Sequence, residues 1–501
     1  MADRTGATVA LILGGAVWAA IAGAEPLAES PKAEITNGLL THEAPSVGVL
    51  LRVGPDGRVV TSCSATLIGC ETVLTAAHCF CGDDLPAGPC VQSGMAEAMR
   101  QEHVFALQHA GAFAIKSVSI HPDYDFPLKG DVAVLKLDGR AEGIVPSRIN
   151  TVRQVPLGTT GAIVGFGHSG SGADHGLKRA GLITTSECRD PRDGKLKDGL
   201  VCWRFLPPLG PPGEDSNTCQ GDSGGPLFVD LGTGPVIAGV TSGGAGLCAS
   251  NDLAFDADTY RYRGWIAQRG GSDISQDRCG SIPPLGQPTS GANAFTGTLS
   301  PAVRSATYYV DVPAGADVLR FALNGADGAS NDFDLVVRYG SQPTDTQHDC
   351  WDDTYGPYGF CEFAQPSAGR WFVAAVWYGG IGTYQISASA FGWDAAASPT
   401  YTPTQPRTAT PSPSRTATRR LSAPTPSRTP TRRSSPAPGP CYGDCNGDGM
   451  VAVNEIVAGV SIALGSAPAD ACPALQAGAG TVTVDQLIRA IALSLNGCPP
   501  T

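Results

Sequence analysis

The sequence predicts a mainly β protein, and three observations support this prediction. Glycine (64) and proline (40) are abundant among the 501 residues, whereas aromatic residues make up only 7%. This composition suits strands joined by turn-rich loops better than long helices. Short strand-like runs broken by Gly, Pro and Asn fill two long stretches, 35–270 and 288–394, and helical spacing of apolar residues is confined mainly to the end of the chain. At about 100–200 residues per domain, the length corresponds to about three domains.

The N-terminus has the features of a secretory signal peptide. Arg4 supplies a positive start, residues 7–22 are apolar or small, and Ala22-Gly23-Ala24 fits a cleavage site. We expect residues 1–24 to be removed on export and the short polar stretch 25–34 to be a propeptide. The alternative is a membrane anchor, but the apolar run is shorter than the roughly 18–20 residues that span a bilayer. No other stretch is long and apolar enough to cross one.

Charge and cysteine content restrict the class of function. The net charge is −12, which argues against nucleic-acid binding, since that requires a basic face. Sixteen cysteines in an exported chain indicate disulfides rather than metal thiolates. The sequence therefore predicts a secreted, disulfide-bonded protein without a transmembrane span.

The first long stretch, residues 35–270, reads as an all-β sandwich or barrel. Its strand-like runs include SVGVLLRV, GAIVGFG and PVIAGVTSG, and one helix is expected near its end, at TYRYRGWIAQR. Residues 271–287 form a connector. The second stretch, residues 288–394, has alternating runs such as VLRFAL and FDLVVRY, with no helical periodicity, and is predicted to be a small β-sandwich.

Three segments carry candidate catalytic residues. CSATLIGCETVLTAAHC ends in His78-Cys79, KGDVAVLKL contains Asp131, and TCQGDSGGPLF contains Ser223. A serine hydroxyl is a poor nucleophile without an adjacent base, and histidine can take its proton and later return it. A carboxylate then holds the imidazole tautomer. Each residue alone is more often structural, but the three together and in this order indicate a hydrolytic triad.

These segments resemble the trypsin/chymotrypsin family of serine proteases, which shares the order His, Asp, Ser. The resemblance implies a double six-stranded β-barrel and a serine endopeptidase that hydrolyses peptide bonds through an acyl-enzyme. Ser223 would attack, His78 would act as base and then acid, and Asp131 would orient His78. The N–H groups of Gly221 and Ser223 would form the oxyanion hole. Catalysis would need no cofactor, and the partners would be protein or peptide substrates.

The same resemblance implies a set of disulfides. Three pairs match bridges of the family, and the other cysteines of the first stretch, together with Cys279 of the connector, are paired here as a guess. The family pairs are Cys63–Cys79, Cys188–Cys202 and Cys219–Cys248, and the guessed pairs are Cys70–Cys81 and Cys90–Cys279.

Activation is also implied by the resemblance. Ile35-Thr36-Asn37-Gly38 is similar to the mature start of the family, so cleavage before Ile35 would free an ammonium that pairs with Asp222. The alternative is that this segment is a plain turn. Glu34 stands where trypsin-activated zymogens have Lys or Arg, so the sequence leaves the activating protease open.

The resemblance also implies a substrate pocket, with Asn217 at its base, Ala254 at its rear wall, and walls at Ser242, Gly243 and Gly244. A carboxylate is missing from the base, so we expect a neutral or mixed preference at P1, the substrate residue before the cleaved bond. The alternative is that an insertion in EDSNTC lets Asp215 reach the pocket, which would favour Arg or Lys.

Residues 288–394 resemble the bacterial pre-peptidase C-terminal domain, in FTGTLS, YYVDVPAGADVLRFAL, NDFDLVVRYGSQPT and SAGRWFVAAVWYGGIGTYQIS. The resemblance implies a β-sandwich that helps secretion or substrate attachment, and the alternative is a solubilising spacer. Cys350 and Cys361 would form a disulfide that closes one loop of this sandwich. Asp332 and Asp334 are candidate Ca²⁺ ligands.

The C-terminal part consists of a linker and a small module. Residues 395–440 are rich in Pro, Ser, Thr and Arg and cannot form a core, so we expect a disordered linker. Residues 441–501 contain the EF-hand-like loop DCNGDGMVAVNE before a helical segment. Its expected Ca²⁺ ligands are Asp444, Asn446, Asp448, the Met450 carbonyl and Glu455.

A degenerate second copy of this loop has Leu475, Ala477, Ala479 and Gln486 at the ligand positions and should not bind Ca²⁺. Tandem loop–helix units resemble dockerins, which implies a cohesin-like or cell-surface partner and an α-helical module. The leading hypothesis for the whole chain is a secreted endopeptidase. The alternatives are a catalytically silent adhesin and a Ca²⁺-dependent docking subunit on a protease fold.

Overall fold

The computed structural model describes residues 35–393, except 84, 128, 170–174, 190–197, 245–247, 249–251 and 329, together with the isolated residues 445, 462, 472 and 474. The expected signal peptide, propeptide and linker lie outside the described residues, as does nearly all of the EF-hand-like module. The chain divides into two compact units, 1–408 and 409–501. Both barrels and the β-sandwich belong to the first unit.

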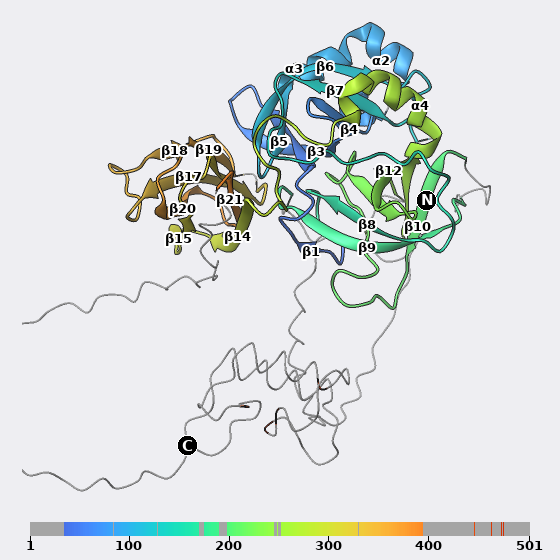
Figure 1. The fold of residues 1–501 in the computed structure, drawn as a ribbon. Helices are drawn as coiled ribbons and strands as arrows, with labels where there is room; N and C mark the ends of the chain where they lie inside the picture. Colours follow the sequence, from blue (N-terminus) through green and yellow to red (C-terminus); the bar gives the residue numbers. More distant parts are fainter. Residues whose placement is uncertain are drawn as a thin grey trace, which may run out of the picture. The chain divides into compact units, whose positions relative to one another are not determined.

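The first barrel is a closed ring of six strands in the order β2-β3-β4-β7-β6-β5 (Figure 1). Side chains alternate between its interior and its surface, as in β5, where His103, Phe105 and Leu107 are buried and the residues between them are only partly so. The strands are β2 (Val47–Val53), β3 (Val59–Leu67), β4 (Thr72–Thr75), β5 (His103–Leu107), β6 (Gly111–Ile120) and β7 (Ala133–Leu137).

The second barrel is closed by pairing of β8 with β9, and the short β1 adds to its edge. Its core contains Ile35, Trp203, Leu227 and Ala254. The strands are β1 (Leu39–Leu40), β8 (Thr160–Gly165), β9 (Arg179–Ser186), β10 (Leu200–Phe205), β11 (Pro226–Asp230), β12 (Pro235–Gly243) and β13 (Asp252–Asp258). The two six-stranded barrels confirm the fold that the sequence predicts.

Helices are few among the described residues. The predicted helix at the end of the first stretch is confirmed as α4 (Thr259–Gly270), which Asp258 caps by accepting a hydrogen bond from Tyr260 N. The sequence analysis missed the short helices α1 (His78–Cys81), α2 (Ala87–Ser93) and α3 (Met95–Glu102), and the 3₁₀ turn η1 (Gly271–Ser275). No helix among the described residues is long and apolar enough to cross a membrane.

The predicted β-sandwich is present as two four-stranded sheets, ordered β14-β21-β16-β19 and β15-β20-β17-β18. Their inner faces form one apolar core that includes Phe321, Phe333 and Ile386. The strands are β14 (Ser290–Leu299), β15 (Ser305–Val312), β16 (Val318–Gly325), β17 (Asp332–Tyr339), β18 (Cys350–Asp352), β19 (Tyr358–Ala364), β20 (Gly369–Gly379) and β21 (Gly382–Phe391).

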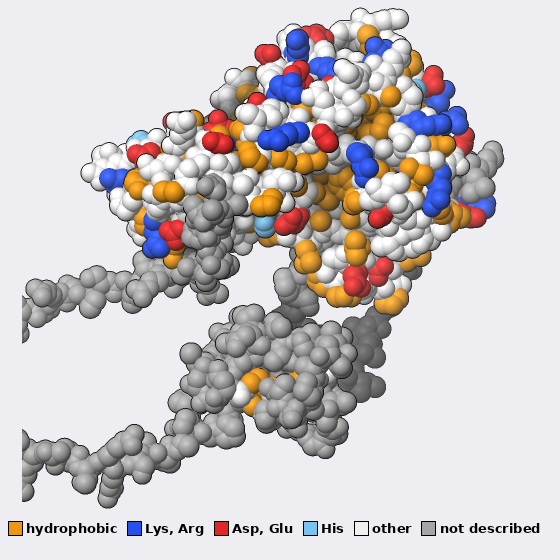
Figure 2. Space-filling model, viewed as in Figure 1, with side chains coloured by type: hydrophobic (Ala, Val, Ile, Leu, Met, Phe, Trp, Pro, Cys, Tyr) orange, Lys and Arg blue, Asp and Glu red, His pale blue; other side chains and the backbone are white. Residues whose placement is uncertain are grey.

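Charged side chains of both signs are interspersed over the visible face of the first unit, as Figure 2 shows. No continuous basic surface is visible among the described residues of this face.

Candidate active site

His78 and Asp131 meet at the centre of the candidate active site. His78 is the first residue of α1, and Asp131 lies just before β7. The imidazole Nδ1 of His78 is 2.7 Å from Asp131 Oδ2, and the His78 backbone N–H donates to Asp131 Oδ1 at 2.9 Å. Ser242, near the end of β12 in the second barrel, donates its hydroxyl to the same Oδ2 at 2.6 Å. The carboxylate thus bonds to residues of both barrels and fixes the imidazole between them.

The His78–Asp131 pair is buried and polarised. Only 13% of the His78 side chain and 4% of the Asp131 side chain are exposed. Burial lowers the pKa of His78, but the charge of Asp131 and its hydrogen bond together outweigh this effect, so the pKa of His78 is raised above 6.5. Asp131 therefore favours the imidazolium, which is the form that His78 would take after accepting a proton.

Ser223 lies next to this pair, on the turn before β11. Its carbonyl accepts a hydrogen bond from Ser64 N at 2.8 Å, and it lies 3.9 Å from the sulfur of Cys79, the residue that follows His78. The side chain is partly exposed. Among the described residues, no hydrogen bond joins the Ser223 hydroxyl to His78, and such bonds in ligand-free enzymes are often long.

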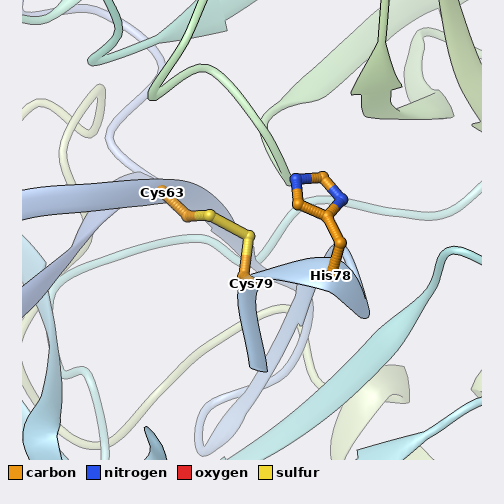
Figure 3. Close-up of side chains that lie close together, drawn as sticks. All are labelled: Cys63, His78 and Cys79. Carbon is orange, nitrogen blue, oxygen red and sulfur yellow. A yellow bond between two sulfur atoms is a disulfide. The ribbon is translucent and has the colours of Figure 1, made fainter. Parts of the chain in front are cut away.

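The disulfide Cys63–Cys79 anchors α1 to β3 beside the imidazole (Figure 3). His78 and the two sulfurs lie within 4.8 Å of one another, a spacing that could hold a metal ion. The two sulfurs are bonded to each other, however, and only thiolates act as zinc ligands. This cluster is therefore a structural support for His78 and not a metal site.

Gly221 has a backbone conformation that favours glycine. Its φ is 91°, in the left-handed region, and an added Cβ would lie 2.9 Å from the Cα of Gly167. Ser64 Oγ donates to the Gly221 carbonyl at 2.9 Å. Ser64, a residue of the first barrel, therefore helps to hold the backbone between Gly221 and Ser223 in one conformation.

The protease stretch matches a known family. The family model named Trypsin matches residues 41–266. The trypsin of Saccharopolyspora erythraea is 33% identical over 205 residues, which cover 39% of this chain and 80% of that protein. The chain belongs to the trypsin family.

Other relatives of this trypsin-family chain include serine protease 1 of Homo sapiens, 28% identical over 224 residues, or 41% of this chain and 85% of that protein. Granzyme M of Homo sapiens is 31% identical over 223 residues, or 42% of this chain and 77% of that protein. The bacterial pre-peptidase C-terminal domain model matches residues 304–375, within the β-sandwich, which supports the resemblance found there.

The two expected activation residues are both buried in this trypsin-family fold. Ile35 is 1% exposed and packs in the core of the second barrel. Asp222 is 1% exposed, and its carboxylate accepts hydrogen bonds from Gly167 N at 2.8 Å and Cys219 N at 2.9 Å. Glu34, on the other side of the expected cleavage, lies outside the described residues.

The expected pocket residues occupy the second barrel. Asn217 and Ala254 are buried, Ser242 is buried with its hydroxyl directed to Asp131, and Gly244 follows directly after β12. The alternative that Asp215 reaches the pocket is wrong. Its side chain is exposed and accepts a hydrogen bond from Gly210 N at 2.9 Å, and its backbone has a positive φ of 45°.

The structure contains the four disulfides expected from family resemblance, Cys63–Cys79, Cys188–Cys202, Cys219–Cys248 and Cys350–Cys361. The guessed pairs are wrong. Helices α1 and α2 bring Cys81 to Cys90, and the segment after η1 brings Cys279 to Cys70. Asp273 of η1 secures that segment by accepting a hydrogen bond from Cys70 N. Sequence separation cannot reveal either contact.

The expected calcium ligands of the C-terminal module lie outside the described residues, so this site stays a prediction, as does the dockerin-like assignment. In that module the structure shows the disulfide Cys445–Cys472. In the β-sandwich, Asp334 accepts a hydrogen bond from Trp351 Nε1, and Asp332 accepts one from Gly356 N. These bonds give both carboxylates a structural role.

Sequence reasoning missed three residues of this region. Ser242 was assigned to the pocket wall, whereas its hydroxyl bonds Asp131. Ser64 clamps the turn that carries Ser223, and only its place one residue after Cys63 could have pointed to it. Asp256 on β13 is fully buried, and burial raises its pKa well above the ordinary value of 3.8 despite the nearby Thr241 hydroxyl.

Proposed function

We propose that the chain is a secreted serine endopeptidase that uses His78, Asp131 and Ser223. The observation that carries this proposal is the buried His78–Asp131 pair, held from both barrels and placed beside the turn of Ser223. Membership of the trypsin family supports the reaction type. The proposed division of the chain keeps residues 35–270 as the protease domain and 288–394 as the β-sandwich.

In the proposed mechanism, the Ser223 hydroxyl attacks the carbonyl carbon of the peptide bond while its proton passes to Nε2 of His78. Asp131 holds the opposite nitrogen, Nδ1, and stabilises the imidazolium. The carbonyl oxygen becomes an oxyanion, which the N–H groups of Gly221 and Ser223 would stabilise. His78 then gives its proton to the leaving amine, an acyl-enzyme remains, and water releases it by the same proton transfers in reverse order.

The turn that carries Ser223 supports the oxyanion assignment. The carbonyls of Gly221 and Ser223 are both engaged by Ser64, one by its hydroxyl and one by its N–H. These bonds fix the 221–222 and 223–224 peptide units. The units that carry the Gly221 and Ser223 N–H groups are held through their own carbonyls, since His168 N donates to the Gln220 carbonyl and Gly225 N to the Asp222 carbonyl, both at 2.8 Å. Donors held before the reaction cost no reorganisation when charge develops.

Activation and specificity are finer parts of the proposal. Cleavage before Ile35 would release an ammonium that pairs with Asp222. Asn217 at the pocket base favours a neutral or mixed preference at P1, and the outward position of Asp215 removes the argument for Arg or Lys that rested on it. The disulfides favour an oxidising, extracellular location.

Labelling with a fluorophosphonate tests the proposal directly. The secreted chain should react covalently and cleave a peptide library, and Ser223→Ala should lose both properties. Ser93→Ala is a matched control, because it removes a serine hydroxyl whose hydrogen bond, to the Cys90 carbonyl, lies within α2. Correctly folded protein without Ser223-dependent labelling would support the catalytically silent adhesin instead. N-terminal sequencing of the active protein should begin at Ile35.

A further inference from the structure

The β-sandwich is bonded directly to the protease domain. Gln385 of β21 accepts a hydrogen bond from Lys178 N at 2.8 Å and donates its amide to the Thr41 carbonyl at 3.2 Å. Ser387 donates its hydroxyl to the Gln108 carbonyl at 2.9 Å. Lys178 is 0% exposed at this interface. Polar side chains of the sandwich thus make hydrogen bonds that these backbone groups of the protease domain would otherwise make with water.

A first set of contacts reaches β3, the strand that leads to the active site. Val59 N donates to the Tyr355 carbonyl of the sandwich at 2.8 Å. Two residues further on, Thr61 N donates to the Asp327 carboxylate, and the Thr61 hydroxyl bonds to the Tyr358 hydroxyl. Three residues of the sandwich therefore fix the position of one short length of β3.

The same strand clamps the segment that we call the oxyanion segment, residues 219–224. Ser64, three residues after Thr61, donates its N–H to the Ser223 carbonyl and its hydroxyl to the Gly221 carbonyl. Between the two positions β3 has a β-bulge, where Leu50 pairs with Cys63 and Leu51 with Thr61, so a displacement at Thr61 reaches Ser64 through this short bulged length of chain. The sandwich is thereby connected to the backbone on both sides of Asp222.

A second set of contacts reaches the oxyanion segment through the connection between β8 and β9. Asp327 N donates to the His175 carbonyl at 2.8 Å, and the next residue, Gly176, donates to the Phe166 carbonyl at 2.8 Å. The residue after Phe166 donates its N–H to Asp222 Oδ1 at 2.8 Å. Asp327 thus takes part in both sets, with its carboxylate in the first and its backbone in the second.

We propose that the β-sandwich is a positioning element of the active site, and that Asp327 and Tyr358 hold the oxyanion segment in place through β3. This inference rests on the proposed function, because an oxyanion segment matters only where an oxyanion forms. Its physical basis is that donors stabilise a transition state only when they are held at the required geometry. The sandwich would then be needed for full turnover, in contrast to a spacer that only aids solubility or export.

The variants are made in the full secreted chain. Asp327→Ala removes the acceptor for Thr61 N, whereas Asp327→Asn keeps an acceptor oxygen of the same shape and should restore the contact. Tyr358→Phe removes one hydroxyl and leaves its ring packed. Ser387→Ala is the matched control, because it removes a hydrogen bond of the same interface that ends at Gln108 and not at β3.

We expect kcat per folded molecule to fall about tenfold in Asp327→Ala, the effect of losing one hydrogen bond to a charged group, with KM for a short acyl substrate nearly unchanged. Asp327→Asn and Ser387→Ala should stay within about twofold of the unmodified chain. Hydrogen–deuterium exchange, which needs no activity, should become faster across residues 219–227 in Asp327→Ala and stay unchanged in Ser387→Ala.

An equal loss of kcat in Asp327→Ala and Ser387→Ala would overturn the proposal, since it would show a general effect of the interface. Unchanged exchange at residues 219–227 in both Asp327→Ala and Tyr358→Phe would overturn it as well. The exchange result decides the coupling even if Ser223→Ala leaves hydrolysis intact, an outcome that would refute the proposed function and not the coupling. If Asp327→Ala fails to fold, Tyr358→Phe takes its place as the variant that weakens the contact with β3, and it is compared with Ser387→Ala in the same two measurements.

Discussion

Asp131 and Asp256 are both buried carboxylates of the protease domain, but their surroundings differ. Asp131 accepts hydrogen bonds from His78 N, His78 Nδ1 and Ser242 Oγ. Neither oxygen of Asp256 has a well-formed hydrogen bond among the described residues, and burial raises its pKa well above 3.8. Burial alone therefore does not make a carboxylate useful for catalysis. Donors directed at the carboxylate of Asp131 hold it in place next to the histidine that it must stabilise.

The largest expected effect comes from replacing the carboxylate of Asp131, which accepts these hydrogen bonds. Asp131→Asn should lower kcat by about 10⁴, because an amide at this position favours the wrong imidazole tautomer. Steady-state kinetics on a peptide substrate measures this loss. Asp256→Asn is the matched control, the same substitution at the other buried carboxylate, and should keep kcat within about threefold. Similar losses in both variants would remove the distinction between the two sites.

The next effect is on stability. Asp256→Asn should raise the free energy of unfolding at pH 8 by about 1–3 kcal/mol, because it removes an acid that is buried without good hydrogen bonds. The folded pKa of Asp256 lies above the unfolded value, so the folded state binds more protons and its stability is lost as pH rises. The gain from the substitution should therefore shrink as pH falls towards about 4. Urea denaturation at several pH values measures it, and a gain that does not vary with pH would refute this explanation.

A smaller effect is expected at Ser242. Ser242→Ala removes one of the hydrogen bonds to Asp131 and should lower kcat about three- to tenfold, with folding retained. Comparing this loss of kcat with the loss in Asp131→Asn then separates the contribution of one hydrogen-bond donor from that of the whole carboxylate. Ser93→Ala, which loses a hydroxyl on α2, provides the control. An unchanged kcat in Ser242→Ala would mean that the two donors from His78 suffice.

The smallest effect concerns the pH dependence. Since the pKa of His78 is raised above 6.5, kcat/KM should fall as pH drops through a midpoint above 6.5, where the base becomes protonated. Asp83 adds a minor charge contribution to this raised pKa, so Asp83→Asn should move the midpoint to lower pH. Asp83 is exposed, and high salt should cancel the difference between the two proteins. A shift that persists at high salt would contradict this account.

Much of the fold could be predicted because turn residues and strand alternation are local. The two β-rich stretches, the helix α4 and sandwich strands such as β16 and β17 follow from such patterns. Helices α1 to α3 could not be predicted, because they are short and are stabilised by packing and by the Cys81–Cys90 bridge. The cysteine guesses failed for the same reason, since Cys70 and Cys279 meet across a sequence separation of 209.

The sequence by itself determined the residue types of the site, because His78, Asp131 and Ser223 lie in motifs whose chemistry can be read residue by residue. Only the tertiary structure decided their partners. Ser242 reaches Asp131 from the other barrel, Asp256 is buried without good hydrogen bonds, and Asp327 of the sandwich contacts β3 from a separation of 266 residues. Hydrogen bonds depend on distances of a few tenths of an ångström, and the order of residues along a chain does not contain those distances.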